Sequence, residues 1–268
     1  MFVLDALTHR LKHGCQTMAY PQGPAPALPD RHGGALRVNA TKCLDQCTAC
    51  LPVCPTQAIT RPAGKPVALD LGRCLFCGDC VTACPPHAIT QTGDHRLAAR
   101  ARADLVVGAA GQEEVRLAAA LDGELRRLFG RSLRLRQVSA GGCNACEADT
   151  NVLGTIGWDL GRFGIQFVAS PRHADGLLIT GPVTQNMTLA LRKTYDAVPG
   201  PKIVIAVGAC AISGGPFVGH AEVHNGADSL LPVDLYIPGC PPHPLTILDG
   251  LLRLLGRLET RSASGEKR

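Results

Sequence analysis

Cysteine is the residue type with the clearest chemistry in this sequence. The chain holds 13 cysteines in 268 residues, and eight of them fall between Cys43 and Cys84. The run CTACLPVCPTQAIT at residues 47–60 returns as CGDCVTACPPHAIT at residues 77–90, with the same proline after the last cysteine. Thiols this closely spaced favour a metal centre over disulfides in a chain with no secretory signal. A duplicated unit of this size also predicts two similar halves related by a pseudo-two-fold axis.

The second copy indicates which metal centre this is. It reads Cys74-x2-Cys77-x2-Cys80-x3-Cys84-Pro, the run typical of bacterial ferredoxins, in which the fourth cysteine ligates the other of two clusters. Three cysteines in a tight loop can reach three corners of one cube, and the proline turns the chain toward the neighbouring cube. Carried over by motif, this assigns one [4Fe–4S] cluster to Cys43, Cys47, Cys50 and Cys84, and the other to Cys74, Cys77, Cys80 and Cys54.

The first copy departs from the pattern, because Cys43-x3-Cys47 has one residue more than expected. The loop over residues 44–46 could bulge and keep Cys43 as a ligand, or it could leave a weakened or three-iron cluster. Zinc is the alternative for any Cys-x2-Cys pair. The repeated eight-cysteine frame with two Cys-Pro endings favours iron–sulfur clusters, since a zinc ribbon does not need them.

Four more cysteines, Cys143, Cys146, Cys210 and Cys240, lie beyond residue 140, each after a predicted strand or in the glycine-rich loop that follows it. Such loops converge at the carboxyl edge of an open α/β sheet, where ligands bind. Glycines there let backbone amides approach and hydrogen-bond the sulfurs of a cluster. The spacing favours a third cluster over zinc or free thiols.

The elements around these cysteines predict two domains of the α/β class. Strands are expected at residues 133–138, 165–169, 176–180, 203–207 and 235–237, with helices at 187–198 and 245–258. Their alternation indicates a mostly parallel sheet with helices on its faces. We therefore expect an α+β ferredoxin-like domain at 36–94, a helical linker at 95–131 with a helix over 112–129, an α/β domain at 132–258 and a frayed polar tail at 259–268.

The first 35 residues are expected to form an amphipathic helix followed by a Pro- and Gly-rich connector. Val3, Leu7 and Leu11 share one helical face, which suits a partner surface, a membrane interface or packing on the chain's own domain. A net charge of +5 with no basic stripe argues against nucleic-acid binding. The longest uncharged stretch, residues 203–219, is too short and glycine-rich to span a bilayer. We expect a cytoplasmic protein.

Several motifs carry a family resemblance. GGCNACEAD, SPRHAD, LLITGPVT, VGACAISGG and IPGCPP, between residues 140 and 258, resemble the small-subunit family shared by respiratory complex I and energy-converting [NiFe] hydrogenases. The N-terminal part, including Tyr20-Pro21, resembles the two-cluster ferredoxin subunit of the same complexes. The resemblance implies a fusion of the two subunits, with one [4Fe–4S] cluster on a flavodoxin-like domain that docks on a large catalytic subunit.

The spacing Cys143-x2-Cys146 separates the branches of this family, because complex I members have two adjacent cysteines there. The sequence thus more closely resembles the group 4, formate-hydrogenlyase-like hydrogenases, whose nickel and iron would lie in another polypeptide. Cys15 is isolated. The predicted function is an electron relay through three clusters to the [NiFe] site of a large subunit, with further membrane-arm subunits holding the chain at the inner face of the cytoplasmic membrane.

Two rival functions remain open. The large partner could lack nickel and reduce a quinone or another acceptor, as in complex I, or the clusters could only stabilise an assembly module. Three further residues are weaker candidates. Glu147 follows a ligand and could transfer protons or simply sit at a helix N-terminus, while Arg172 and His173 follow a strand end and could tune the third cluster or serve as ordinary surface groups.

Overall fold

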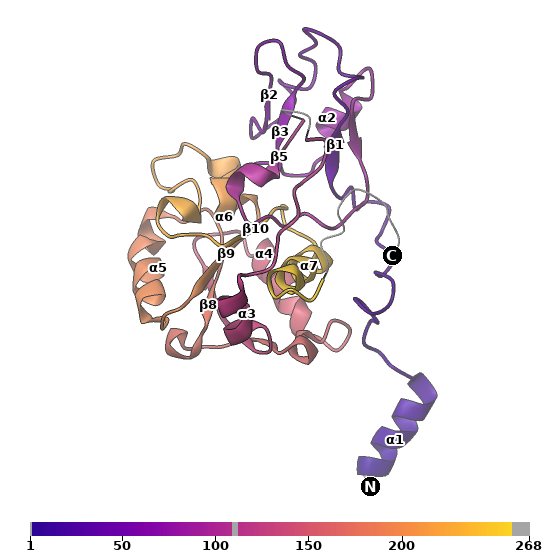
Figure 1. The fold of residues 1–268 in the computed structure, drawn as a ribbon, viewed down its shortest axis with the longest axis vertical. Helices are drawn as coiled ribbons and strands as arrows, with labels where there is room; N and C mark the ends of the chain where they lie inside the picture. The colour runs from indigo at the N-terminus through magenta and orange to yellow at the C-terminus, as the bar shows by residue number, and fades with distance from the viewer. Residues whose placement is uncertain (1, 109–111, 259–268) are drawn as a thin grey trace.

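A computed structural model describes residues 2–108 and 112–258. Figure 1 shows a small upper part, formed by the cysteine repeat, standing on a larger α/β part, with the N-terminal helix projecting from the far end. The upper part and the N-terminal segment contain α1 (Phe2–His13), β1 (Leu36–Val38), β2 (Ile59–Thr60), β3 (Ala68–Asp70), α2 (Asp79–Thr82), β4 (Ile89–Gln91) and β5 (Val106–Val107). The tail expected to fray lies outside the described residues.

The upper part has the short antiparallel strands expected of a ferredoxin-like domain. β1 pairs with β4, and β3 pairs with both β2 and β5. The two copies of the repeat have matching local geometry: Gln57 and His87 both have positive φ, and their N–H groups donate to the carbonyls of Cys54 and Cys84. Because β5 pairs with β3, this sheet takes in residues beyond the expected boundary at 94.

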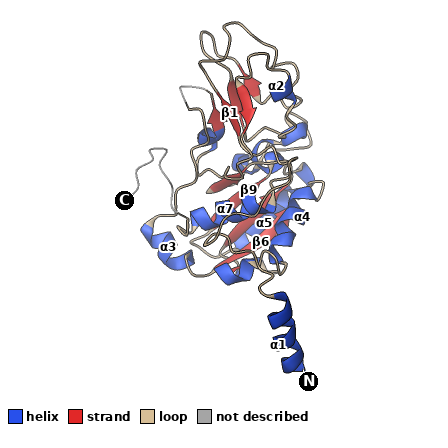
Figure 2. Ribbon diagram, turned by 90° about the vertical axis from the view of Figure 1, so that its right-hand side faces the viewer, coloured by secondary structure: helices blue, strands red, loops and turns tan. Residues whose placement is uncertain are grey.

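The larger part is a five-stranded parallel sheet with helices on both faces (Figures 1 and 2). Its elements are α3 (Gly123–Phe129), β6 (Leu133–Ser139), α4 (Ala145–Asn151), β7 (Ile165–Phe167), β8 (Gly176–Thr180), α5 (Gln185–Ala197), β9 (Ile203–Val207), α6 (Ala209–Ser213), β10 (Leu235–Ile237) and α7 (Pro244–Leu254). Numbered within this part, the order β10-β9-β8-β6-β7 is 5-4-3-1-2, which is the flavodoxin-like arrangement. The predicted fold class is confirmed.

The sheet separates two layers of the core. The central strands β8 and β9 are buried at every residue, as expected for a parallel sheet covered on both faces. One face packs against α7, whose leucines are fully buried. The other face packs against α5 and α6, and its apolar cluster continues without a break into the core of the upper part. The two parts therefore share one hydrophobic core.

The connector between α1 and β1 packs against the α/β part on its way to the cysteine repeat. Tyr20 is 8% exposed, and its O–H donates to Oδ1 of Asp249 on α7 at 2.9 Å. Arg253, one turn further along α7, donates to the other oxygen of Asp249 at 2.7 Å. The guanidinium of Arg162 binds the carbonyls of Met18 and Tyr20, each at 2.7 Å. The connector is therefore bound to the α/β part through the Tyr20 side chain and through the backbone carbonyls of Met18 and Tyr20.

The segment between the two parts corrects one prediction. The helix expected over 112–129 forms only at α3, while residues 112–122 are extended or irregular. Backbone N–H groups of this stretch donate to carbonyls outside it. The N–H of Ala118 donates to the Ala98 carbonyl, and the N–H of Leu121 donates to the Leu254 carbonyl. Asp122 then accepts from the N–H of Leu125, and this N-cap is where the helix begins.

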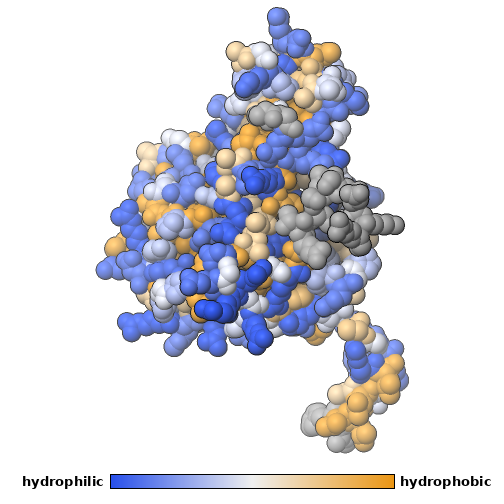
Figure 3. Space-filling view, in the orientation of Figure 1, coloured by the Kyte–Doolittle hydropathy of each residue, from blue (hydrophilic) through white to orange (hydrophobic). Residues whose placement is uncertain are grey.

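The N-terminal helix forms as predicted, but it does not pack back on its own domain. Val3, Leu7 and Leu11 are 73%, 54% and 85% exposed, and Figure 3 shows an apolar surface along α1 where it projects from the molecule. Its last turn carries Arg10, Lys12 and His13. Of the expected roles, a partner surface and a membrane interface therefore remain. None of the helices in the described residues is long and apolar enough to cross a membrane.

Candidate iron–sulfur sites

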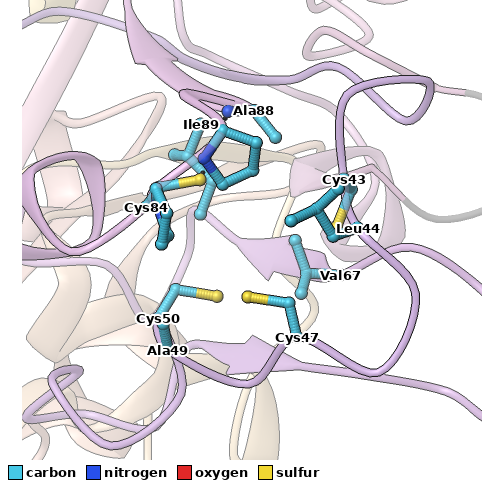
Figure 4. Close-up of a pocket in the computed structure, with 11 residues that line it drawn as sticks. Cys43, Leu44, Cys47, Ala49, Cys50, Val67, Cys84, Ala88 and Ile89 are labelled. Carbon is cyan, nitrogen blue, oxygen red and sulfur yellow. Dashed lines mark hydrogen bonds between the residues drawn. The ribbon is translucent and has the colours of Figure 1, made fainter.

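Four cysteines from both copies of the repeat surround one hollow in the upper part. Cys43, Cys47, Cys50 and Cys84 line it, together with apolar side chains such as Val67 and Ile89. Figure 4 shows the sulfurs of Cys47 and Cys50 pointing toward each other and that of Cys84 pointing into the space beside them. Cys84 therefore lies with three cysteines of the other copy, as a crossed ligation would require.

The second group of four is Cys74, Cys77, Cys80 and Cys54. The pKa of the Cys74 thiol is raised to about 12, by burial first and then by the nearby Cys80, Cys54 and Cys77, against a backbone hydrogen bond from Phe76 that lowers it. The pKa of Cys80 is also raised to about 12, by burial first and then by Cys77 and Cys54. Cys54 thus lies beside the cysteines of the second copy, the reciprocal of the crossing made by Cys84.

Backbone amides are directed at the sulfurs in both groups. The N–H of Ala58 donates to Cys54 Sγ and that of Ala88 donates to Cys84 Sγ, each at 3.2 Å and each four residues after its cysteine. Such bonds favour a thiolate and tune a cluster bound to it. Within the described residues, no group of His, Cys, Asp and Glu side chains converges closely enough to hold a single metal ion. The first group of cysteines surrounds a hollow instead, which fits a cube.

The inserted residue between Cys43 and Cys47 forms a bulge rather than displacing the first cysteine. Gln46 takes a positive φ of 60°, as Phe76 does with 57° in front of Cys77, so the extra residue is absorbed earlier in the loop. Arg61 secures this bulge. Its Nη2 donates to the Leu44 carbonyl at 2.7 Å and to Cys43 Sγ at 3.2 Å. Sequence reasoning did not single out Arg61.

The third group lies at the carboxyl edge of the parallel sheet. Cys143 and Cys146 follow β6, Cys210 follows β9 and Cys240 follows β10, and the loop after β6 meets the end of β8 at the switch point of the sheet, where ligands bind. Burial raises the pKa of Cys146, as do its neighbours Cys210, Cys240 and Cys143. Burial raises the pKa of Cys210 to about 11, with Cys240 and Cys143 adding to it. The three loops thus lie together at one edge of the sheet.

The backbone around the third group leaves room only for glycine. A Cβ added at Gly208 would lie 2.5 Å from Cys146 Sγ, and one added at Gly215 would lie 3.0 Å from Cys210 Sγ. Cys143 and Cys240 are exposed, whereas Cys146 and Cys210 are partly buried. The backbone therefore lies close to the sulfurs of Cys146 and Cys210, while Cys143 and Cys240 face the surface of the protein.

The second and third groups are joined by a direct contact between the two parts. The hydroxyl of Ser213, at the end of α6, donates to the Gly72 carbonyl at 3.0 Å, and both groups are buried. Gly72 lies two residues before Cys74, and Ser213 lies three residues after Cys210. A residue close to the second group of cysteines therefore contacts a residue close to the third.

Glu147 lies at the third group in a mostly enclosed position. Its side chain is 6% exposed, and the hydroxyl of Thr180 donates to its Oε1 at 2.6 Å. Burial alone would raise the pKa of this carboxyl, but hydrogen bonds from Ser139, Thr180 and its own backbone lower it below the usual value. Its carboxyl also borders an open, polar hollow lined by Arg136, Asn144 and Thr194 among others.

Arg172 and His173 do not lie where the sequence suggested. Both are exposed on the 3₁₀ turn Pro171–His173, which leads into the first residue of β8. The cysteine loops follow the opposite ends of the strands, about 13 Å away along a five-residue strand. We therefore drop a tuning role for them at the third group. Cys15 is exposed and apart from all three groups.

The strand order and the cysteine loops together define an iron–sulfur protein built from a dicluster ferredoxin part and a flavodoxin-like part. Comparison with known families agrees with this division. Residues 32–89 match the 4Fe-4S dicluster domain, and residues 143–254 match the family described as NADH ubiquinone oxidoreductase, 20 Kd subunit. The chain belongs to this 20 Kd subunit family, which includes the small subunits of [NiFe] hydrogenases.

Relatives of the α/β part come from both branches of the family. The probable membrane-bound hydrogenase subunit mbhJ of Pyrococcus furiosus is 42% identical over 135 residues, which is 50% of this chain and 81% of that protein. A subunit of the NADH-quinone oxidoreductase of Clostridium beijerinckii is 48% identical over 114 residues, 42% of this chain and 68% of that one. Formate hydrogenlyase subunit 7 of Escherichia coli is 43% identical over 143 residues, 53% of this chain and 56% of that one.

These matches fix the general function. The chain is an iron–sulfur electron-transfer subunit of an oxidoreductase, in a complex of the complex I-like or group 4 hydrogenase type. Its dicluster domain binds [4Fe–4S] clusters.

Proposed function

We propose that the chain carries three [4Fe–4S] clusters and relays electrons to the [NiFe] site of a large partner subunit. The observation that supports three clusters is the set of three cysteine groups, each of four residues, with amide donors or glycine cradles around the sulfurs. The predicted ligands stand as proposed: Cys43, Cys47, Cys50 and Cys84 for the first cluster, Cys74, Cys77, Cys80 and Cys54 for the second, and Cys143, Cys146, Cys210 and Cys240 for the third. Each cluster would accept and release one electron at a time.

The residues of the chain set the order of the relay. The contact between Ser213 and Gly72, which lie close in sequence to Cys210 and Cys74, supports an order in which the second group neighbours the third and the first group is outermost. Electrons from a donor would thus enter at the first cluster, cross the second and leave through the third. The exposure of Cys143 and Cys240 supports an exit at the surface, where a large subunit would dock.

The hydrogenase branch is favoured by the ligand spacing at the third group. Cys143 and Cys146 are separated by two residues, whereas the family's complex I members have adjacent cysteines at this position. A complex I-like large subunit without nickel, which reduces a quinone or another acceptor, is the alternative.

Membrane-arm subunits would hold the complex at the inner face of the cytoplasmic membrane, with α1 as a contact. Glu147 would pass protons between the polar hollow and the docked partner.

The test is metal analysis and activity of the chain and of its complex. The anaerobically purified chain should contain about twelve iron atoms with matching acid-labile sulfide, the content of three cubes. The chain alone should evolve no hydrogen, whereas the complex should contain nickel and evolve hydrogen from a low-potential donor. Cys240→Ala should abolish that turnover while the two clusters of the repeat remain reducible by dithionite. Stoichiometric zinc without visible charge-transfer absorption would refute the cluster assignment, and a nickel-free, inactive complex would move the function to the quinone-type relative.

A further inference from the structure

The two copies of the repeat differ at one charged position. Arg61 lies seven residues after Cys54, and the matching residue, seven after Cys84, is Gln91. The copy with the arginine is also the copy with the extra residue between its first two cysteines. Two departures from the repeat therefore occur together, at positions that contact each other in the folded chain.

The contact replaces a hydrogen bond that the other copy makes with its backbone. In the second group, the N–H of Phe76 donates to Cys74 Sγ at 3.2 Å. The bulge removes the corresponding amide from Cys43, and the side chain of Arg61 donates to Cys43 Sγ at the same distance of 3.2 Å. The sulfur thus keeps one donor, but the donor is now a cation rather than a neutral amide.

The charge of this guanidinium is not neutralised by a carboxylate. Among the described residues, the carboxylates in salt bridges pair with other arginines, and Arg61 is bound only to Cys43 Sγ and the Leu44 carbonyl. Its Nε is buried and has no hydrogen-bond partner within the described part of the chain. Arginine remains protonated at any physiological pH. A full positive charge is therefore held against one sulfur of the first group.

We propose that Arg61 sets the reduction potential of the first cluster by holding this charge at Cys43. A reduced cluster is one unit more negative than an oxidised one, so a fixed cation beside it favours the reduced form. Arg61 acts through Cys43 and is a positioning and tuning residue, and the inference rests on the proposed ligation of that cluster. The effect is local, because Gln91 supplies no charge to the second group.

The experiment is a redox titration of the complex, followed by electron paramagnetic resonance. Cys47→Ser first identifies the signal of the first cluster by altering it. At the potential where that cluster is half reduced in the native protein, Arg61→Gln should lower the ratio of reduced to oxidised cluster about tenfold, which is about 59 mV for a one-electron couple. The signals of the other two clusters should not shift.

Two matched variants separate charge from structure. Arg61→Lys keeps the charge but loses the forked geometry, and the ratio should stay within about threefold of the native value. Arg37→Gln removes a partly exposed charge of β1 in the same part, paired with Glu114 rather than with a sulfur, and should shift nothing. Equal shifts in Arg61→Gln and Arg37→Gln would overturn the proposal.

Iron analysis keeps the test decisive if Arg61→Gln fails to hold the first cluster. In that case Arg61→Lys should still hold it, with a near-native ratio. Loss of the first cluster in both variants would show that Arg61 only secures the loop, and the tuning role would be wrong. A native chain without any cluster bound through Cys43 would instead contradict the proposed function itself.

Discussion

Gly208 provides the sharpest test of the third cluster, because its replacement by alanine brings two separable costs. Gly208 has a φ of 90° and a ψ of 155°, a backbone region open essentially only to glycine, and alanine there costs about 1–3 kcal/mol. The added Cβ would also lie 2.5 Å from Cys146 Sγ, closer than carbon and sulfur atoms can pack. The sulfur must therefore leave its present position, so Gly208→Ala should lose the third cluster while the chain remains folded.

Gly219→Ala is the matched control for this change. Gly219 has a φ of 80°, in the same part of the chain, but an added Cβ would meet nothing within 4 Å. Both variants should be destabilised by about 1–3 kcal/mol from the backbone alone, a fall in Tm of roughly 2–12 °C. Only Gly208→Ala should fall from about twelve iron atoms per chain to about eight.

Iron content, circular dichroism and electron transfer to the partner would be measured on both variants. Full iron in Gly208→Ala would show that Cys146 is not held beside Gly208 by a cluster. Equal iron loss in both variants would attribute the loss to backbone strain instead, and either result would refute the reasoning about the cradle.

Three further predictions follow from the contacts described above. Cys54→Ser should alter the cluster held by Cys74 and leave the first cluster intact, as spectroscopy of single-cluster signals would show; damage to the first cluster instead would exclude the crossed ligation. Tyr20→Phe removes the donor to the buried carboxylate of Asp249 and should cost about 1–3 kcal/mol in denaturant unfolding, whereas a cost below about 0.5 kcal/mol would mean that the connector is not held there. Deleting residues 2–13 should change the unfolding free energy by less than about 0.5 kcal/mol, since the apolar face of α1 is exposed, yet reduce recovery of the complex with membranes.

Features with a short repeat or a strong apolar run could be predicted from the sequence. Three strands were predicted with their observed limits, at residues 176–180, 203–207 and 235–237. Each is a short run of apolar, strand-favouring residues between turn residues. The pairing of Cys84 with the first group follows from a motif whose geometry is local. In both cases the chemistry of neighbouring residues decides the structure, so no knowledge of distant contacts is needed.

Features decided by distant contacts could not be predicted. The stretch 112–122 has helix-forming residues, but its backbone N–H groups donate to the carbonyls of Ala98 and Leu254, which lie far from it in the sequence. Arg172 and His173 follow one strand end but precede another strand, and only the register of β8 places them at the wrong edge. Arg61 could have been noticed in the sequence, because the matching residue of the other copy is uncharged and the inserted residue occurs in the same copy as Arg61. The contact itself forms only when the loop folds back onto β2.

In the proposed relay, the fusion of the two parts fixes the junction between the second and third groups, whereas the exit from the third group depends on a partner. Four features hold the two parts of the chain together: the shared apolar core, the bond from Ser213 to Gly72, the backbone bonds between Ala99 and Tyr236, and the connector anchored at Tyr20. Separate subunits would have to assemble this junction by docking, with its cost in lost translational and rotational freedom. At the third group, by contrast, Cys143 and Cys240 remain exposed, so the distance to the next acceptor is set by the partner alone. In the proposed relay, the partner therefore decides between hydrogen evolution and reduction of another acceptor, whereas the steps within this chain are the same for both.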